Sequence, residues 1–532
     1  MEKALFSLIL MPKILAVVEN PSQFNGKPMN KFELYLDGRK GKLSNWDLYI
    51  ATGKDREVFF QGQTTNDIQS MDTNTFNLNS RVDRTGKIQF FFINIKTENE
   101  LFLLIPSEVS DSAIEELNKY IIMDEVELSK DSRDIFFSFE DDSSHFYSGF
   151  LFGLPAKLSF KEFSNFLKEL SSEEELKLKI ETGWPTWGVD VHAGDLINNT
   201  RLVDLAVSFQ KGCFLGQETV AKVHNGRGAS FYPSLLVSED ISKLNSSPFT
   251  INGRKGGEII SKVGNVAMIK LFREFRIENK NFEVIQDNES FKFCFQNYLE
   301  NLTIKEFSHE LYLFAVSSFQ SGNEDLAISA LRRVIALTPD FSDAYESLGV
   351  IYGRQEKFEQ GIELMDQLLS VNESSVMAHT NKSLYLMRLG KIEEAEEEKG
   401  LATVKSFAEY GKIAKENKLK EQQDKEREEQ ISQRESMFRQ VLVIDEDDTI
   451  ANFGIADVYF HRKEFESAKR HLLKVISVDE KYSTAYSLLG KTLEVLGEKE
   501  RAKEVYTKGI EVASAKGELM PANEMQARLI KL

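Results

Sequence analysis

The sequence predicts three successive parts: an α+β domain, a small β-barrel and an all-α superhelix of 34-residue repeats. Three observations lead to this fold class. Strand-like runs mix with amphipathic helical runs between residues 31 and 180. Short strand-like runs then alternate with Gly, Asn and Ser turns from about Ser230 to Glu300, which is typical of a small barrel. Beyond Glu300 the composition changes to Leu, Ala, Glu and Lys, and small residues recur every 34 positions.

Composition limits the classes of function. The chain has 532 residues, a net charge of -18 and two cysteines, Cys213 and Cys294. The negative charge argues against a general nucleic-acid-binding surface. Two cysteines make no disulfide framework and fit a reducing compartment, and no Cys/His group has metal-ligand spacing. We therefore expect a cytoplasmic protein with no bound metal and no direct nucleic-acid binding.

Residues 1–30 are predicted to be an N-terminal extension. The run from Ala4 to Val18 is apolar, but Pro12-Lys13 interrupts it too early for a membrane span. No small-residue cleavage pattern follows, as a signal peptide requires. Met29 offers an alternative start.

Periodicity predicts the elements of the α+β domain. Strands are expected at Phe32–Leu36, Trp46–Ile50, Ile88–Ile95 and Leu101–Ile105, and a helix at Phe160–Leu170. A short helix is expected to close at Gly62, where a left-handed cap costs little. The segment Asp83-Arg84-Thr85-Gly86-Lys87 is predicted to be a tight turn that leads into a strand.

The segment from Gln210 to Gly228 carries the most chemistry. A cation, a thiol, an amide and a carboxylate lie within eight residues, at Lys211, Cys213, Gln217 and Glu218. Gly212 and Gly216 permit positive φ or a close backbone approach, and Gln217–Val223 is predicted to be a helix. A helix start and a nearby lysine both favour a thiolate at Cys213. A buried, unreactive cysteine is the alternative.

The run Lys211-Gly212-Cys213-Phe214-Leu215-Gly216-Gln217-Glu218 resembles the signature of the YgfZ branch of the GcvT-like folate-binding proteins, with Phe214 in the place of the usual Tyr. The resemblance extends from Lys31 to Glu300, through Gly53–Asp67, Asp83–Lys87 and Ile180–Asp190. It implies an aminomethyltransferase-like folate-binding fold. The sequence departs from the family at Glu175, where a tryptophan is usual, and at Ile197-Asn198, where Pro-Gln or Pro-Glu is usual.

This resemblance also implies a function. Members of the family bind tetrahydrofolate or a derivative and support iron–sulfur enzymes, including enzymes that modify tRNA. Cys213 is then the functional thiol, either reactive itself or facing the iron–sulfur cluster of a client protein, and Lys211 is the cation that tunes it. The implied folate-binding residues are Trp46, Gln63, Asn66, Asp83, Gln217, Glu218 and Arg227. For Trp46 the alternative is a core aromatic residue.

The repeats are predicted from the spacing of small residues. The pairs or series 34 apart are Ala327/Gly361/Ala395, Ala344/Ala378, Ala451/Ala485, Ala456/Gly490 and Ala468/Ala502. This is the tetratricopeptide period, and small residues there allow the two helices of a hairpin to approach closely. Pro339 ends one unit. Such arrays present a concave surface, on which we expect a protein partner.

The predicted domains are therefore the extension 1–30, the folate-binding α+β domain 31–229, the barrel 230–302 and the tetratricopeptide array 303–532. A charged helical insertion at 393–439 is interpreted as a degenerate or lengthened repeat. Two alternative functions stay open. One is a tetrahydrofolate-dependent aminomethyltransferase, although no counterpart of that enzyme's catalytic aspartate is found. The other is a tetratricopeptide adaptor with a vestigial folate site.

Overall fold

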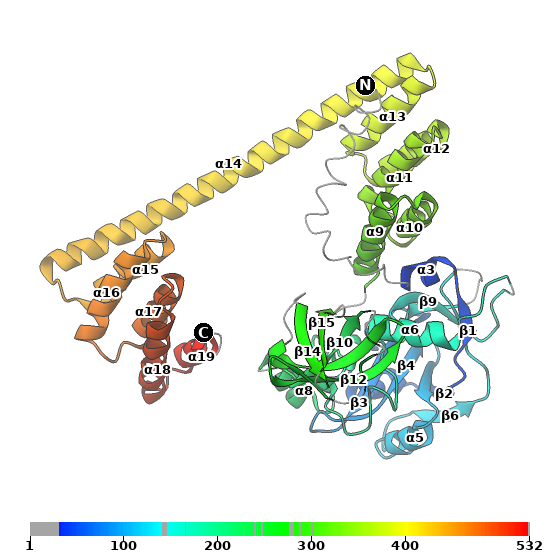
Figure 1. Ribbon diagram of the computed structural model, residues 1–532, viewed down its shortest axis with the longest axis horizontal. Helices are drawn as coiled ribbons and strands as arrows, with labels where there is room; N and C mark the ends of the chain where they lie inside the picture. The colour runs from blue at the N-terminus through cyan, green and yellow to red at the C-terminus, as the bar shows by residue number, and fades with distance from the viewer. Residues whose placement is uncertain are drawn as a thin grey trace. The chain divides into compact units, whose positions relative to one another are not determined.

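A computed structural model of the chain describes residues 31–529 except for 141–145, 165, 227, 239–240, 242, 246–247, 276–280, 287–288, 297 and 299–302. The described residues divide into two compact units, of which the first ends at Ala402 and the second begins at Thr403. The first contains a mixed sheet, a closed barrel and helical hairpins, and the second is helical (Figure 1). The predicted fold class is thus confirmed in all three of its parts.

A nine-stranded sheet is the centre of the described α+β domain. Its strand order is β1-β7-β9-β8-β3-β4-β5-β2-β6, with β3 and β8 parallel and the other paired strands that are described antiparallel. The strands are β1 (Lys40–Lys42), β2 (Trp46–Thr52), β3 (Thr75–Val82), β4 (Ile88–Lys96), β5 (Leu101–Pro106), β6 (Glu127–Asp131), β7 (Phe136–Ser138), β8 (Tyr147–Leu151) and β9 (Leu154–Ser159). Three of the four predicted strands, β2, β4 and β5, are therefore present.

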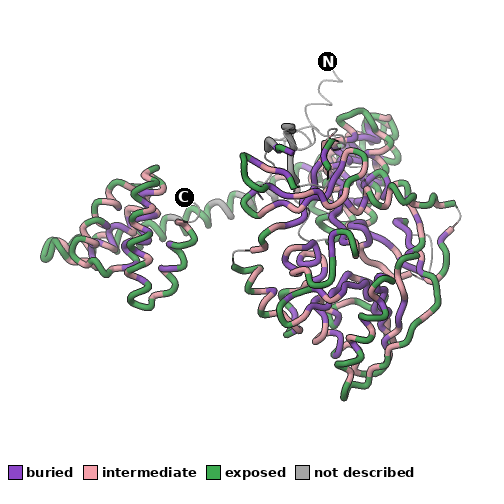
Figure 2. The backbone as a smooth tube through the Cα atoms, turned by 60° about the horizontal axis from the view of Figure 1, so that its bottom comes forward, coloured by how far each residue is buried: buried purple, intermediate pink, exposed green. Residues whose placement is uncertain are grey.

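Both faces of the sheet are buried. Side chains alternate along β4, so Phe90 and Phe92 join one core cluster while Phe91, Ile93 and Ile95 join the other. Figure 2 shows the buried residues of the first unit in purple. The helices here are α3 (Lys31–Leu36), α4 (Arg56–Gln63), α5 (Ser110–Asn118), α6 (Ser172–Thr182), α7 (Leu202–Leu205) and α8 (Gln217–Asn225), together with the 3-10 turn η2 (Ile197–Asn199).

Three local predictions are wrong. The strand expected at Phe32–Leu36 is the helix α3, because Phe32 and Tyr35, three residues apart, must both reach one aromatic partner. The helix expected at Phe160–Leu170 is absent from the described residues of that segment. Its backbone instead pairs with Lys40, whose N–H donates to the Lys168 carbonyl at 3.0 Å and whose carbonyl accepts from the Leu170 N–H at 2.8 Å.

The third concerns Gly62, which does not cap α4. Gly62 does not have the positive φ that a left-handed cap requires, and the helix continues to Gln63. Thr64 ends it instead, because its Oγ1 and N–H both donate to the Phe60 carbonyl, at 2.7 and 3.0 Å. The Gly62 carbonyl is left to accept from the Leu215 N–H at 3.2 Å.

The predicted barrel is present and closed, in the order β10-β13-β12-β11-β14-β15. Its strands are β10 (Phe231–Val237), β11 (Phe249–Ile251), β12 (Arg254–Val263), β13 (Val266–Phe272), β14 (Asn281–Gln286) and β15 (Glu289–Gln296). Leu236, Ile251 and Ile269 are fully buried inside it. Closure leaves no free sheet edge, which explains how such short strands form a stable domain.

Helical hairpins follow the barrel in the first unit. They are α9 (Ile304–Gln320) with α10 (Glu324–Leu337), α11 (Ser342–Arg354) with α12 (Phe358–Val371), and α13 (Val376–Arg388) with the start of α14 (Ile392–Ile444). Gly361 is one of the predicted small positions, and a Cβ there would lie 2.9 Å from the Tyr385 ring. The close approach inferred from the 34-residue spacing is therefore confirmed.

The repeats of the first unit pack directly on the α+β domain through α3. The Phe32 and Tyr35 rings lie 5.7 and 5.0 Å from the Phe307 ring of α9, and Lys31 Nζ lies 2.8 Å from a Glu310 carboxylate oxygen. These aromatic residues belong to one core cluster that also extends to Tyr385. The predicted domain boundary at 302/303 therefore crosses a continuous core. That the parts on its two sides fold independently stays a prediction.

The charged segment 393–439 lies within a single helix, α14, of 53 residues. The segment was expected to be a degenerate or lengthened repeat on a solvated helix face. Ile392–Ile444 contains no proline and is rich in Glu, Lys, Gln and Ala, so helix propensity continues through it. The described residues in its middle are mostly exposed (Figure 2). In the second unit its C-terminal turns pack on α15 (Thr449–His461), where a Cβ on Gly454 would meet the Phe438 ring.

The second unit continues the array with α16 (Phe465–Val478), α17 (Ser483–Val495), α18 (Lys499–Lys516) and α19 (Leu519–Leu529). Its predicted small positions Ala451, Ala456, Ala468, Ala485 and Ala502 are all buried. A Cβ on Gly490 would lie 2.1 Å from the Tyr506 ring, so this position also requires glycine. No helix among the described residues is long and apolar enough to cross a membrane.

The contact between α3 and α9 predicts coupled unfolding of the domain and the first repeats. Phe32→Ala and Phe307→Ala should each lower the free energy of unfolding by about 3–5 kcal/mol, since both rings are buried. The double variant should lose about 0.5–1.5 kcal/mol less than the sum of the losses of the two single variants. Urea unfolding followed by tryptophan fluorescence measures this, because all three tryptophans precede Ala402.

The matched control is Phe166→Ala, whose side chain is 98% exposed and should change stability by less than about 0.5 kcal/mol. Strict additivity of the Phe32 and Phe307 substitutions would contradict the contact.

Candidate functional site

The segment singled out in the sequence lies against two others, residues 62–67 and 83–87. The part of that segment that makes these contacts is residues 208–219. We call residues 208–219, 62–67 and 83–87 together the signature cluster. The Thr65 carbonyl accepts from the Ser208 N–H at 3.0 Å, and the Gly62 carbonyl accepts from the Leu215 N–H. The Arg84 carbonyl accepts from Thr219 Oγ1 at 3.3 Å. Segments more than 100 residues apart therefore form one local structure.

Gly216 fixes the entry into α8. Its φ is +83°, and a Cβ there would lie 2.3 Å from the Asp83 carbonyl oxygen. Both predicted reasons for a glycine, a positive φ and a close backbone approach, therefore hold at Gly216. Neither holds at Gly212, which has no positive φ and open space around it. The predicted helix is present as α8, with Val220 fully buried beneath it.

Lys211 is buried, with 7% of its surface exposed. Its ammonium donates to the carbonyls of Thr64 and Asn66, at 2.7 and 2.8 Å, and lies 5.4 Å from the centre of the Phe214 ring. Burial lowers the pKa of Lys211 to about 8, against the opposing effect of the Asp67 carboxylate. The described hydrogen bonds of this ammonium thus go to backbone carbonyls, and its influence on the thiol stays a prediction.

Cys213 is exposed at the surface of the signature cluster, two residues from the buried Lys211 and next to the buried Phe214. The alternative of a buried cysteine is therefore wrong. Three residues lie between Cys213 and Gln217, the first residue of α8. Cys294 lies in β15 as expected, but its side chain is outside the described residues.

The polar residues predicted to bind folate in this region are engaged with the protein itself. Asp83 Oδ1 accepts from the Thr85 N–H and Oγ1 and from the Lys87 N–H, at 2.7, 2.7 and 3.0 Å. Burial alone would raise the pKa of Asp83, but the hydrogen bonds from Thr85 and Lys87 outweigh it and lower the pKa. These bonds close the predicted turn, and Gly86 has the expected positive φ.

Gln63 and Asn66 have similar structural roles. Gln63 Oε1 accepts from Arg81 Nη1 at 2.6 Å, and Asn66 Nδ2 donates to the Leu78 carbonyl at 2.8 Å. Gln217 is half-buried and Glu218 is exposed, beside the exposed thiol of Cys213. Arg227 lies outside the described residues. The structure therefore brings Gln63, Asn66, Asp83, Lys211, Cys213, Gln217 and Glu218 into one cluster.

Trp46 lies elsewhere, in a cavity of about 660 Å³ that we call the tryptophan cavity. All three tryptophans of the chain line it: Trp46 at the start of β2, and Trp184 and Trp187 just after α6. Both Trp46 and Trp187 contact the Phe91 ring, at 5.9 and 6.0 Å between centres. The other lining residues are Lys42, Leu43, Ser44, Asn45, Pro106, Ser107, Glu108, Leu170, Ser172, Glu175, Lys179, Pro185, Thr186 and Val189. None of them belongs to the signature cluster.

The walls of this cavity are set by α6 and the loop that follows it. A capping box between Ser171 and Glu174 starts α6, and Gly183 in a left-handed conformation ends it. The Trp184 N–H then donates to the Lys179 carbonyl at 2.9 Å, so the chain turns back and presents Trp184 beside the helix. Neither Trp184 nor Trp187 was predicted as a site residue, although both lie within the run Ile180–Asp190 that carried the resemblance.

The two departures from the family pattern lie in different places. Glu175 lines the tryptophan cavity, where its carboxylate lies 2.6 Å from Lys179 Nζ. Ile197 and Asn198 lie in η2 under α8, and Asn198 Nδ2 donates to the Val220 carbonyl at 3.1 Å. The first departure changes the chemistry of the cavity, and the second supports the helix of the signature cluster.

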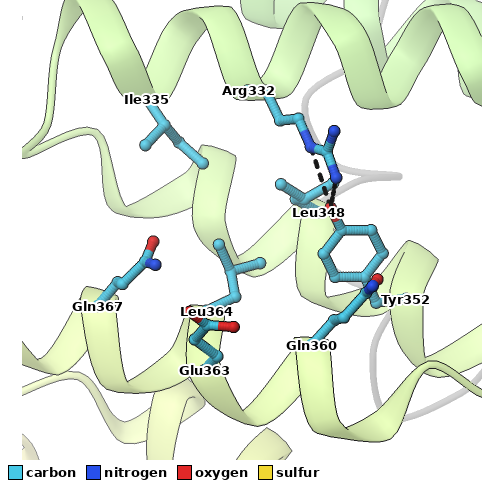
Figure 3. Close-up of a pocket in the computed structure, with 8 residues that line it drawn as sticks. All are labelled: Arg332, Ile335, Leu348, Tyr352, Gln360, Glu363, Leu364 and Gln367. Carbon is cyan, nitrogen blue, oxygen red and sulfur yellow. Dashed lines mark hydrogen bonds between the residues drawn. The ribbon is translucent and has the colours of Figure 1, made fainter.

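The repeats of the first unit have a cavity of their own, of about 300 Å³, between α10, α11 and α12 (Figure 3). Ile335, Leu348 and Leu364 form its apolar part. Arg332 donates to the Tyr352 hydroxyl from Nε and Nη2, at 3.1 and 2.7 Å. Gln360, Glu363 and Gln367 line it from α12. No group of three or more potential metal ligands is found in the described part of the chain.

The mixed sheet, the closed barrel and the helical hairpins together define a YgfZ-like domain followed by a tetratricopeptide array. Tetratricopeptide repeat models match residues 351–410 and 483–516. The "tRNA-modifying protein YgfZ" of Photorhabdus laumondii is 28% identical over 237 residues, which are 38% of this chain and 71% of that protein.

A second relative is an uncharacterized protein of Haemophilus influenzae, 26% identical over 243 residues, which are 42% of this chain and 83% of that one. The solved aminomethyltransferase T of the glycine cleavage system from Bartonella henselae superposes with a TM-score of 0.40 at 13% identity, covering 51% of this chain and 89% of that chain.

The geometry at Gly216 predicts a sharp contrast between two glycines of the signature cluster. Gly216→Ala should lower the free energy of unfolding by about 3 kcal/mol or more, since it adds a Cβ at positive φ against backbone. Gly212→Ala is the matched control and should be nearly neutral. Urea unfolding of both variants tests this, and equal stabilities would contradict the described loop.

The burial of Lys211 predicts a pH dependence of stability. Its pKa is about 8 in the folded chain and roughly 10.4 in the unfolded chain, so between these values the unfolded state binds more protons. The contribution of Lys211 to the free energy of unfolding should therefore rise by roughly 1–3 kcal/mol as the pH increases between these two pKa values. The test is the difference in unfolding free energy between wild type and Lys211→Met, measured from pH 7.5 to 10. A difference that stays constant with pH would contradict the burial of the ammonium.

Proposed function

We propose that the chain binds a tetrahydrofolate-type ligand in the tryptophan cavity and supports the assembly or maintenance of iron–sulfur enzymes, including those of tRNA modification. The observation that carries the proposal is the convergence of all three tryptophans on one cavity. The similarity to proteins named as tRNA-modifying supports the proposed role in tRNA modification. The repeats then hold a protein partner, which is the usual work of tetratricopeptide arrays.

The cavity has suitable size and chemistry for a folate. Pockets for ligands of this size measure about 300–1,000 Å³, and aromatic walls with a few polar groups are their usual lining. The pyrimidine and aminobenzoyl rings of a reduced folate are planar and stack on indole faces. The polar residues of the lining include Asn45, Glu108, Glu175 and Lys179, which match a ligand with several N–H and C=O groups.

The thiol of Cys213 acts at a different place in this proposal. It is exposed, whereas the folate is held in a cavity to which no residue of the signature cluster contributes. An exposed thiol beside a helix start is accessible to a client protein or its cluster. Folate binding and thiol chemistry should therefore be separable by substitution.

Calorimetric titration of the full chain with 5-formyltetrahydrofolate, a stable reduced folate, tests the ligand. Wild type should bind, and Trp46→Ala should weaken binding about tenfold or more through the loss of one stacking surface. Cys213→Ala is the matched control and should keep the wild-type affinity. If wild type takes up no folate, the adaptor with a vestigial site becomes the better account.

The thiol is tested separately. Iodoacetamide near neutral pH should label Cys213 before Cys294, since Cys213 is exposed at the surface. In cells lacking the protein, Cys213→Ala should fail to restore iron–sulfur enzyme activity while a pull-down still recovers the same partners. Restored activity with this variant would remove the thiol from the proposal.

A further inference from the structure

We propose that the cavity of about 300 Å³ between α10, α11 and α12 binds a segment of the chain itself, the apolar run Ala4–Val18. We call this cavity the repeat cavity. Lys13, the only charged residue of the run, then pairs with Glu363 of α12. The inference goes beyond the proposed function and does not depend on folate binding. An external partner reaches this cavity only by displacing the run.

The repeat cavity has an apolar floor and one acidic wall (Figure 3). On the floor, Leu348 and Leu364 are 1% and 7% exposed. The wall is α12, which carries three carboxylates and no lysine or arginine. Of these carboxylates Glu363 lines the cavity, is exposed, and makes no ion pair in the part of the chain that the structure describes. A matching segment therefore needs apolar side chains for the floor and a cation for Glu363.

The opposite wall does not supply that cation. Arg332 of α10 donates from Nε and Nη2 to the Tyr352 hydroxyl, at 3.1 and 2.7 Å, so its guanidinium is held beside α11. Arg332 and Glu363 both line the cavity, but no ion pair joins them among the described residues. Glu363 is therefore left for a cation from outside these three helices.

The run Ala4–Val18 has the complementary properties. Apart from Ser7 and Lys13, all of its residues are apolar or proline. Leaving so many apolar side chains in water is costly, and exposed apolar surface of this extent marks a binding segment. Lys13 is followed directly by Ile14, so a cation and a branched apolar side chain are adjacent, as the carboxylate and the floor of the cavity require.

The run is joined to the chain close to the cavity. It precedes α3, which begins at Lys31 and lies against α10, where the Arg333 guanidinium is 5.0 Å from the centre of the Tyr35 ring. The connecting residues 19–30 can span at most roughly 40 Å. Passing around α10 to its cavity side requires only roughly 20 Å, because a helix with its side chains is about 10–12 Å across. The run can therefore reach the cavity of its own molecule.

Disulfide trapping in the full chain tests the inference. In a Cys213→Ala background, Ile14→Cys is combined with Gln367→Cys at the cavity lining, and the dilute native protein is mildly oxidised. A link within one molecule should form in most of the protein, detected as joined tryptic peptides by mass spectrometry. The matched control combines Ile14→Cys with Asp366→Cys, an exposed position outside the lining whose carboxylate lies 2.7 Å from Lys382 Nζ of α13, and it should not link.

Charge reversal provides a second measurement on the Ile14→Cys, Gln367→Cys protein. Adding Lys13→Glu or Glu363→Lys should lower the yield of the link about fivefold, and adding both should restore it. The inference is overturned if the lining pair does not link, if the control pair links equally well, or if charge reversal leaves the yield unchanged. A link that forms only between two molecules would overturn it too, as would a run that binds phosphatidylcholine vesicles and gives no link.

Discussion

The interaction on which the signature cluster depends is the burial of one lysine against two backbone carbonyls. Lys211 reaches across to Thr64 and Asn66, where α4 has just ended and the chain turns toward β3. Desolvating an ammonium is costly, and the two short hydrogen bonds and the Phe214 ring offset that cost. With Lys211 fixed inward, the adjacent loop places Cys213 outward, and Gly216 against Asp83 fixes where α8 starts.

The first unit combines two sites with different chemistry. The signature cluster exposes a thiol on a loop whose polar side chains are already engaged, whereas the tryptophan cavity combines aromatic walls with a buried indole N–H, that of Trp184, which lacks a partner among the described residues. The barrel contributes Ser261 and Met268 to a smaller cavity that shares Trp184 with it, and the sheet contacts the first repeats through α3. The α+β domain, the barrel and the first repeats therefore belong to one compact unit.

The sequence alone was sufficient where the signal is local or periodic. The 34-residue spacing predicted the hairpins because a glycine is needed where Tyr385 or Tyr506 crosses a neighbouring helix. The turn at Asp83 and the glycine at 216 were predictable for the same local reason. Phe32–Leu36 was not, because its conformation is decided by Phe307, 275 positions away from Phe32. The convergence of Trp184 and Trp187 with Trp46 likewise depends on the fold, as does the division of the predicted residues between two sites.

The claim that all three tryptophans surround one ligand site can be tested by intrinsic fluorescence, since the chain has no other tryptophan. The full chain is titrated with 5-formyltetrahydrofolate, and free tryptophan amide is titrated in parallel to correct for absorbance by the ligand. The account predicts saturable quenching in the wild type, with Trp46→Phe, Trp184→Phe and Trp187→Phe each removing part of the signal. A corrected emission that does not change at saturating folate would contradict it.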